Sequence, residues 1–152
     1  MRLSRLVLVP VAALLVAACS GGGAATTAPS ASPSASPSAP ATRFAVKLTD
    51  ALRMEPAAMT VPAGVPVTFV VTNSGVADHE FYLGDEDAQA EHEKEMGAMG
   101  GMGHDEPEGI GLKPGETKEL TYTFAAAGTA LAGCHVVGHY GGGMKAEITV
   151  VG

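Results

Sequence analysis

Short runs in which apolar and polar residues alternate fill most of the chain from Arg43 onward. Side chains of a β-strand point alternately to the two faces of a sheet, so this period of two predicts strands with one buried face. Turn-forming Pro, Gly and Asn residues separate the runs at the spacing of an all-β sandwich or barrel. We therefore expect residues 43–152 to form one β-sandwich. The clearest runs contain Phe44, Val46 and Leu48; Val67, Phe69 and Val71; Leu120, Tyr122 and Phe124; and Ala146, Ile148 and Val150.

One segment interrupts this alternation. Residues 88–96 are mostly good helix formers, and the acidic residues 85–87 precede them, as is favourable at a helix N-terminus. Glu91 and Lys94 have the spacing of an ion pair on one helix face. The pattern predicts a short exposed helix inserted between strands, followed by a loop rich in Gly and Met over residues 97–104.

The start of the chain has the features of an export signal. Arg2 and Arg5 precede an apolar run, residues 6–18, that is too short to span a bilayer comfortably. Small residues then lead to Cys19, and the run VAAC resembles the lipobox of bacterial lipoproteins, in which this Cys becomes the acylated first residue. The alternative is a plain signal peptide with a chance Cys. We expect a lipid anchor at Cys19 that holds the protein at the extracytoplasmic face of the cell membrane.

The segment that follows Cys19 has the composition of a linker. Residues 20–42 contain only small uncharged side chains and Pro, so they cannot bury enough apolar surface to fold. Extended polyproline geometry, at about 3.1 Å per residue, would let them reach up to roughly 70 Å. The predicted organisation is a signal peptide over 1–18, a lipidated Cys and linker over 19–42, and a folded domain over 43–152.

The charge balance limits the classes of partner. Nine Lys and Arg residues oppose sixteen Asp and Glu residues, which gives a formal net charge of −7. Such a chain is a poor match for nucleic acid and favours a basic partner or a bound cation. Of the two cysteines, Cys19 lies at the end of the predicted export signal and Cys134 lies in the predicted domain. The sequence therefore does not predict a disulfide framework.

Residues of metal-binding types recur at even spacing near the C-terminus. Cys134, His139 and Met144 form a Cys-x4-His-x4-Met pattern just before the last alternating run. Upstream, His79 shares the strand parity of two apolar neighbours, so its imidazole is expected to point into the interior. A thiolate and two imidazoles in a plane with a weak thioether form the ligand set of blue-copper sites. Soft sulfur ligands favour Cu(I) and imidazoles also accept Cu(II), which suits one-electron cycling.

These residues carry a resemblance to a known family. Together with MTVPAGVPVTFVVTNSG from Met59 and CHVVGHYGGGMKAEITV from Cys134, they resemble the cupredoxin family over residues 43–152, and particularly its single-domain bacterial blue copper proteins. The resemblance implies a Greek-key β-sandwich with one type 1 copper ion at one end. It implies His79, Cys134 and His139 as the ligands in the plane and Met144 as the axial ligand.

Two positions differ from the pattern common in that family. The loop between Cys134 and His139 lacks a Pro, and Glu80 follows the upstream His where Asn is frequent. The second difference bears on hydrogen bonding around the ligands and hence on the reduction potential. His135 is expected to point to the opposite side of the strand and is not predicted as a ligand. A zinc site or an empty site is the alternative for the four ligands.

A second group of soft and imidazole ligands begins on one face of the predicted helix and continues into the loop after it. It forms the hypothesis of an additional copper site, against the alternative of a mobile and oxidisable loop. Ten of the sixteen acidic residues also lie between Glu80 and Glu108, where they could attract Cu(II), dock a basic partner or form a solvated surface. The members of this group are His92, Met96, Met99, Met102 and His104.

Two functions remain from the sequence. The first is a one-electron carrier at the outer face of the cytoplasmic membrane that exchanges electrons with a redox partner protein and catalyses no bond-making. The second is copper handling, meaning storage, scavenging or delivery to a copper donor or acceptor protein. An oxidase or nitrite reductase would need further copper centres with clustered His pairs, and the chain has no His-x-His pattern.

Overall fold

The computed structural model describes residues 41–100 and 104–152. The predicted signal peptide, Cys19, nearly all of the predicted linker and Met102 lie outside the described residues. Within the described part, no helix is both long enough and apolar enough to cross a membrane. The elements follow the order β1 (Arg43–Thr49), β2 (Arg53–Glu55), β3 (Ala58–Pro62), β4 (Pro66–Asn73), β5 (His79–Gly84), α1 (Glu86–Met99), β6 (Gly109–Leu112), β7 (Thr117–Thr123), β8 (Gly128–Gly133) and β9 (Lys145–Val151).

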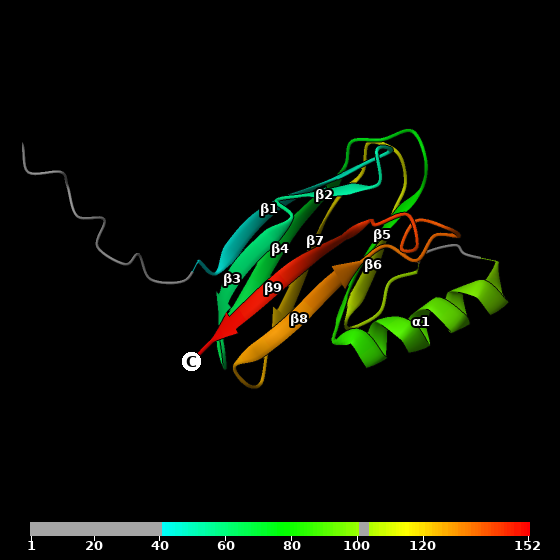
Figure 1. The fold of residues 1–152 in the computed structure, drawn as a ribbon. Coiled ribbons are helices and arrows are strands. Elements are labelled where there is room, and N and C mark those ends of the chain that lie inside the picture. Colours follow the sequence, from blue (N-terminus) through cyan, green and yellow to red (C-terminus); the bar gives the residue numbers. More distant parts are fainter. Residues whose placement is uncertain (1–40, 101–103) are drawn as a thin grey trace, which may run out of the picture. The chain divides into compact units, whose positions relative to one another are not determined.

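The strands form two sheets that pack face to face (Figure 1). One sheet has the order β2-β1-β4-β7 and the other the order β3-β9-β8-β5-β6. The pairs β1–β4 and β3–β9 are parallel, and the other neighbours are antiparallel. The prediction of an all-β sandwich with one inserted helix is therefore confirmed.

The predicted alternation describes the core well. In β4 and β9 every second residue is buried, and these side chains fill the space between the sheets. The aromatic ring of Phe69 is fully buried, with the rings of Phe44, Phe81 and Phe124 centred 5.9, 5.3 and 6.5 Å from it. Burial of one such side chain contributes about 1.5–3 kcal/mol to folding. This core joins both sheets and provides a rigid base for the loops at the sandwich ends.

Helix α1 begins and ends where its capping residues require. The carboxylate of Asp85 accepts a hydrogen bond from the backbone N–H of Ala88 at 2.9 Å, and Glu86 and Asp87 lie in the first turn. Gly100 ends the helix with a left-handed φ of 83°, which glycine adopts without the strain that a side chain would cause. The helix therefore extends further in both directions than the predicted 88–96.

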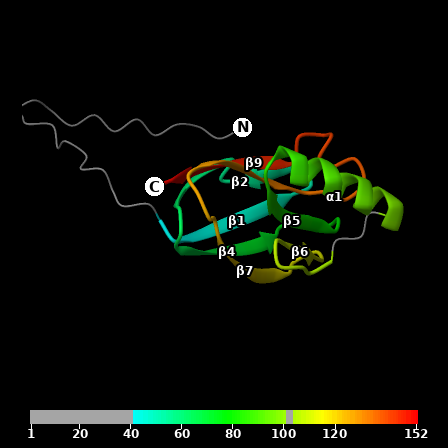
Figure 2. The same ribbon diagram turned by 90° about the horizontal axis from the view of Figure 1, so that it is seen from below.

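The prediction that this helix is exposed was wrong for one of its faces. Gln89, His92 and Met96 are buried. In β5 the side chains of Phe81 and Leu83 belong to the core between the sheets, so by strand parity the intervening side chains project from the other face of the sheet. Helix α1 covers that outer face beside β5 and β8 (Figure 2). Sequence periodicity missed this because two of the three buried residues, Gln89 and His92, are polar.

The topology brings distant parts of the chain to one end of the five-stranded sheet. Strand β8 is antiparallel to both β5 and β9, with Gly133 opposite Tyr82 on one side and Lys145 on the other. The end of β8 therefore lies beside the starts of its two neighbours. Residues at these strand ends therefore meet in space. His79 and Cys134, for example, are 55 positions apart in the sequence but lie in contact.

Candidate metal centre

Three side chains predicted as metal ligands converge at this end of the sheet. His79 begins β5, Cys134 directly follows β8, and His139 lies in the loop between β8 and β9. The Nδ1 atoms of the two imidazoles are 3.2 Å apart, and the Sγ atom of Cys134 lies 3.9 Å from Nδ1 of His79 and 3.4 Å from Nδ1 of His139. His79 and Cys134 are buried and His139 is partly exposed.

The triangle of these three atoms has the size that a metal ion requires. From the three distances, a point equidistant from the atoms lies about 2.0 Å from each of them. Metal–imidazole bonds in proteins are about 2.0–2.1 Å long and metal–thiolate bonds about 2.3 Å. The donor set, one soft sulfur and two imidazoles, fits copper. The residues present therefore fit the metal that the sequence predicts.

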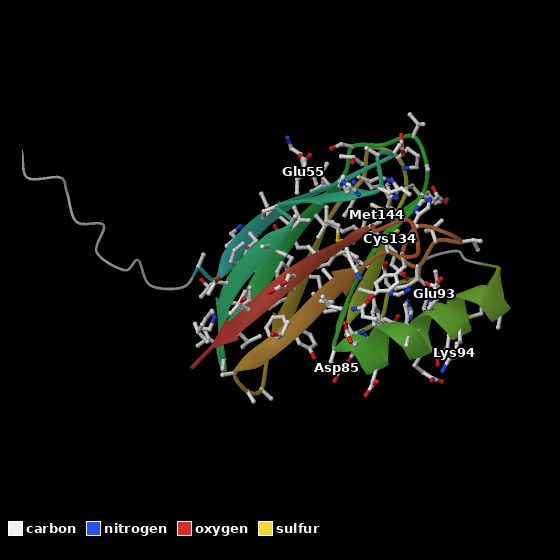
Figure 3. All side chains as sticks on the ribbon, viewed as in Figure 1. Glu55, Asp85, Glu93, Lys94, Cys134 and Met144 are labelled. Atoms are coloured by element: carbon white, nitrogen blue, oxygen red, sulfur yellow. The ribbon has the colours of Figure 1, made fainter. Side chains whose placement is uncertain are left out.

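Met144, the fourth predicted ligand, is the last residue of the loop between β8 and β9. It is fully buried just before β9, and its backbone oxygen accepts a hydrogen bond from the backbone N–H of Cys134 at 3.1 Å. Figure 3 shows Cys134 and Met144 together at the same end of the sandwich. The structure thus brings the fourth predicted ligand residue beside the other three.

The loop that carries these ligands is held by backbone hydrogen bonds rather than by a proline. The backbone N–H of His139 donates to the oxygen of Val136 at 2.8 Å, and the N–H of Met144 donates to the oxygen of His139 at 3.0 Å. Gly138 and Gly143 adopt φ values of 83° and 93°, a region that strongly favours glycine. The tight turns of this loop therefore depend on these glycines.

The orientation of His79 is set by a residue that sequence analysis did not identify. The Nε2 atom of His79 lies 3.3 Å from the carboxylate of Asp50, in the turn between β1 and β2. That carboxylate also accepts hydrogen bonds from the backbone N–H groups of Val76 and Ala77, which lower its pKa. With Nε2–H donating to Asp50, the Nδ1 lone pair of His79 faces the other ligands. Carboxylates commonly fix metal-binding imidazoles in this way.

Asn73 is a second residue that supports the site from outside the ligand set. Its fully buried side chain donates to the backbone oxygens of Ala77 and Leu112 at 2.8 and 3.1 Å and accepts from the N–H of Gly75 at 2.9 Å. These bonds hold the segment that leads into His79. The sequence marked Asn73 as part of a turn, but its ligand-positioning role depends on contacts across the fold.

Burial is the main cause of the pKa shifts of two ligands, Cys134 and His139. Burial raises the pKa of the Cys134 thiol to about 11, and hydrogen bonds from the backbone N–H groups of Glu80 and Val136 offset only part of this rise. Burial also lowers the pKa of His139, and the neighbouring His79 adds to that effect. Without metal, the thiol is therefore protonated at neutral pH and the His139 imidazole is neutral. Metal uptake must then release the thiol proton.

Glu80 and His135 join the ligand end to helix α1. The backbone N–H of Glu80 donates to the sulfur of Cys134 at 3.3 Å, and one carboxylate oxygen accepts from the backbone N–H of His135 at 3.2 Å. The His135 imidazole contacts Glu93 and Gln89 of α1, at 2.6 and 2.7 Å. His135 thus points toward the helix and away from the three converging ligands.

Of the three methionines in the predicted second copper site, the structure describes Met96 and Met99, which differ in burial. Met96 is fully buried and Met99 is 55% exposed, while Met102 lies outside the described residues. The imidazoles of His92 and His104 do lie near each other, with ring centroids 6.1 Å apart. Around them the structure places carboxylates: atoms of Glu80, His92 and Glu106 lie within 4.8 Å of one another.

Comparison with known proteins identifies the family. A family model described as copper binding proteins of the plastocyanin/azurin family matches residues 41–151. The chain belongs to this family. As a plastocyanin/azurin-family protein, it is a copper-binding protein with a cupredoxin fold, as the sequence predicted.

Similar proteins agree with this membership. The copper-resistant cuproprotein CopI of Rubrivivax gelatinosus is 35% identical over 105 residues, which cover 69% of this chain and 64% of that protein. The chain thus spans less than two thirds of that relative. A protein of the same description from Pseudomonas aeruginosa is 34% identical over 125 residues, covering 63% of this chain and 69% of that protein. Reduced auracyanin of Roseiflexus castenholzii superimposes with a TM-score of 0.67 and 26% identity, covering 75% of this chain and all of that one.

Proposed function

We propose that this protein holds one type 1 copper ion at His79, Cys134, His139 and Met144 and carries single electrons. When bound, the copper ion supplies a one-electron couple between Cu(I) and Cu(II). The observation that carries the proposal is the spacing of the three donor atoms. They lie 3.2, 3.4 and 3.9 Å apart, which is close enough for all three to bind one metal ion. Ligands that are held in place in advance need little movement when the charge of the site changes.

The surroundings of His139 support electron exchange at this end of the molecule. Its imidazole is partly exposed, whereas the other two converging ligands are buried. Two exposed apolar side chains lie on the adjoining loops: Val137, 68% exposed, and Val76, 86% exposed. Exposed apolar side chains around a redox ligand provide a surface that a partner protein can cover. We propose that a redox partner docks here, and that the acidic charge of the chain favours a basic one.

A reversible redox couple tests the electron-carrier function. The purified protein is loaded with copper, and its metal content, visible absorption and cyclic voltammogram are measured. One copper per chain, an intense visible band and a reversible wave with fast self-exchange are expected. Tight copper binding with an irreversible or sluggish couple would contradict the electron-carrier function while leaving the copper site intact.

Copper handling is the second candidate, and one observation favours it. The curated relatives are described as copper-resistant cuproproteins. We propose that, if the chain serves this role, cells without it grow more poorly in excess copper. Complementation with a variant that keeps copper binding but lacks a reversible couple separates the functions. Restored growth would favour handling, and failure to restore growth would favour redox activity as the basis of resistance.

The location of the protein is also proposed. An export signal over residues 1–18 and acylation of Cys19 would tether the chain to the extracytoplasmic face of the cell membrane, with residues 20–42 as a spacer. A tethered carrier would stay close to membrane-bound partners. No catalytic role is proposed for the chain.

A further inference from the structure

A second group of metal-binding side chains surrounds His92, on the face of α1 that covers the five-stranded sheet. The His92 imidazole is 2% exposed and stacks on the ring of Tyr82, with centroids 3.8 Å apart and an interplanar angle of 3°. Its Nε2 atom lies 3.1 Å from the buried carboxylate of Glu80. With Nε2–H donating to Glu80, the Nδ1 atom keeps a free lone pair. This is the arrangement by which proteins orient a metal-binding imidazole.

The Nδ1 atom of His92 lies near two carboxylate oxygens, and one of these oxygens also lies near His104. Nδ1 lies 3.5 Å from an oxygen of Glu106 and 3.8 Å from an oxygen of Glu95, and Nε2 of His104 lies 3.8 Å from the same Glu106 oxygen. These separations are longer than hydrogen bonds, which span about 2.7–3.2 Å. They are close to the separation of about 3.3–3.4 Å expected between ligands at tetrahedral corners around an ion with bonds of about 2.0–2.1 Å.

An unpaired buried acceptor lies at the centre of this group. The Oε1 atom of Glu106 is buried and has no hydrogen-bond partner among the described residues. A buried carboxylate oxygen without a partner is costly, so proteins rarely leave one unless another group satisfies it. A cation between Glu106, His92 and His104 would satisfy it and would offset the negative charge of the adjacent carboxylates.

We propose that His92, Glu95, His104 and Glu106 form a second metal site that binds Cu(II). Two imidazoles and two carboxylates are nitrogen and oxygen ligands, which suit divalent ions, and Cu(II) binds such sets most strongly among the common divalent first-row metals. No thioether is needed, in contrast to the Met-rich site predicted from the sequence. Glu95 and His104 are 59% and 46% exposed, so an ion can reach the site from solvent.

Copper binding by the full-length protein tests the second site. The chain is titrated with Cu(II), and bound metal and the electron paramagnetic resonance spectrum are recorded. One equivalent is expected at the Cys134 site and a second with the spectrum of nitrogen and oxygen ligation. In Cys134→Ser an ion at the first site would also have nitrogen and oxygen ligands. The second ion is therefore identified in this variant as the equivalent of bound metal that is lost when His104→Gln is added, which judges its presence independently of the electron-carrier site. Absence of a second equivalent would overturn the proposal and leave an ion pair between His92 and its carboxylates as the role of this group.

Matched substitutions locate the second equivalent. His104→Gln and Glu95→Gln change exposed side chains, and each is expected to weaken the second Cu(II) by at least about tenfold, a loss comparable to that seen when support for a metal ligand is removed. Glu91→Gln removes the same charge from the same helix, but among the residues that the structure describes Glu91 pairs with Lys94 alone, so no change in the affinity for the second Cu(II) is expected. An unaltered visible band at the Cys134 site would show that the variants are folded. Equal loss in all three variants, or no loss in any, would overturn the assignment.

Discussion

At the scale of single residues, the two nitrogens of His79 perform different tasks. Strand parity correctly placed this imidazole on the inner face of β5, because the alternation of buried residues can be read from the sequence. The contact between its Nε2 and Asp50 could not be read, since 29 residues separate the two. Glu80 projects from the opposite face of β5, where α1 covers it and leaves it fully buried, and this cover could not be predicted from the strand pattern. Local patterns thus predicted which side a residue faces but not what covers it.

Replacement of the sulfur ligand should remove the colour of the protein. In Cys134→Ser the thiolate is lost, and in the resembling blue copper proteins the intense visible band arises from thiolate-to-copper charge transfer. The copper-loaded variant is therefore expected to lack this band in a visible absorption spectrum. Val137→Ser provides the control, because Val137 lies in the same loop and its side chain is exposed. The visible band of this variant should remain. A band of full intensity in Cys134→Ser would exclude Cys134 as the ligand.

Replacement of Met144 should change the potential rather than the occupancy. Leu has nearly the same volume as the buried Met144 side chain but no thioether, so Met144→Leu removes a weak donor with little repacking. Loss of an axial donor favours Cu(I), and the reduction potential measured by voltammetry is expected to rise with copper still bound. Met99→Leu, on the exposed part of α1, should leave the potential unchanged. The same potential in Met144→Leu and the unmodified protein would place the axial ligand elsewhere.

At the scale of elements, α1 supports the ligand end through polar contacts that sequence analysis overlooked. Gln89 of α1 donates to the backbone oxygens of Tyr82 and Leu131, on two adjacent strands, at 3.2 and 3.1 Å. The Oε1 atom of the same side chain accepts a hydrogen bond from Nε2 of His135 at 2.7 Å. A helix that buries Gln and His has no apolar stripe, so hydrophobic periodicity predicts it as exposed. The helix itself was predictable because its acidic first turn and helix-forming residues are local signals.

Close packing between α1 and β8 can be tested at Gly133. A Cβ atom at this position would lie 2.2 Å from Oε1 of Gln89 and 2.8 Å from Nε2 of His135, so both groups must move. Gly133→Ala is expected to lower the free energy of unfolding by about 1–3 kcal/mol, as measured by denaturant titration. Gly97→Ala is the control within α1, where a Cβ meets nothing within 4 Å, and should raise stability by about 0.5–1 kcal/mol. Equal stability of Gly133→Ala and the unmodified protein would show that the contact yields easily.

At the scale of the whole molecule, strand content and family could be predicted, but strand order could not. The alternating runs around Val46, Phe69 and Ile148 correspond to β1, β4 and β9, because half-buried strands repeat with a period of two. Nothing local indicates that β1 pairs in parallel with β4 or β3 with β9. That pairing arises from burying both sheets against each other. It also explains why ligands from β5 and from the loop after β8 meet, which the family resemblance implied and periodicity alone did not.

The tether and the copper site are expected to be independent of each other, and reciprocal variants test this. Cys19→Ser removes the predicted acylated residue, so the protein should move from the membrane fraction to the soluble fraction, because the acyl chains supply the membrane affinity. Its visible spectrum should be unchanged, since the folded domain begins beyond the linker. Cys134→Ser should show the opposite behaviour, with membrane association kept and the band lost. Fractionation with immunodetection and spectroscopy of the recovered protein measure both properties. Membrane retention of Cys19→Ser would reject the lipid anchor.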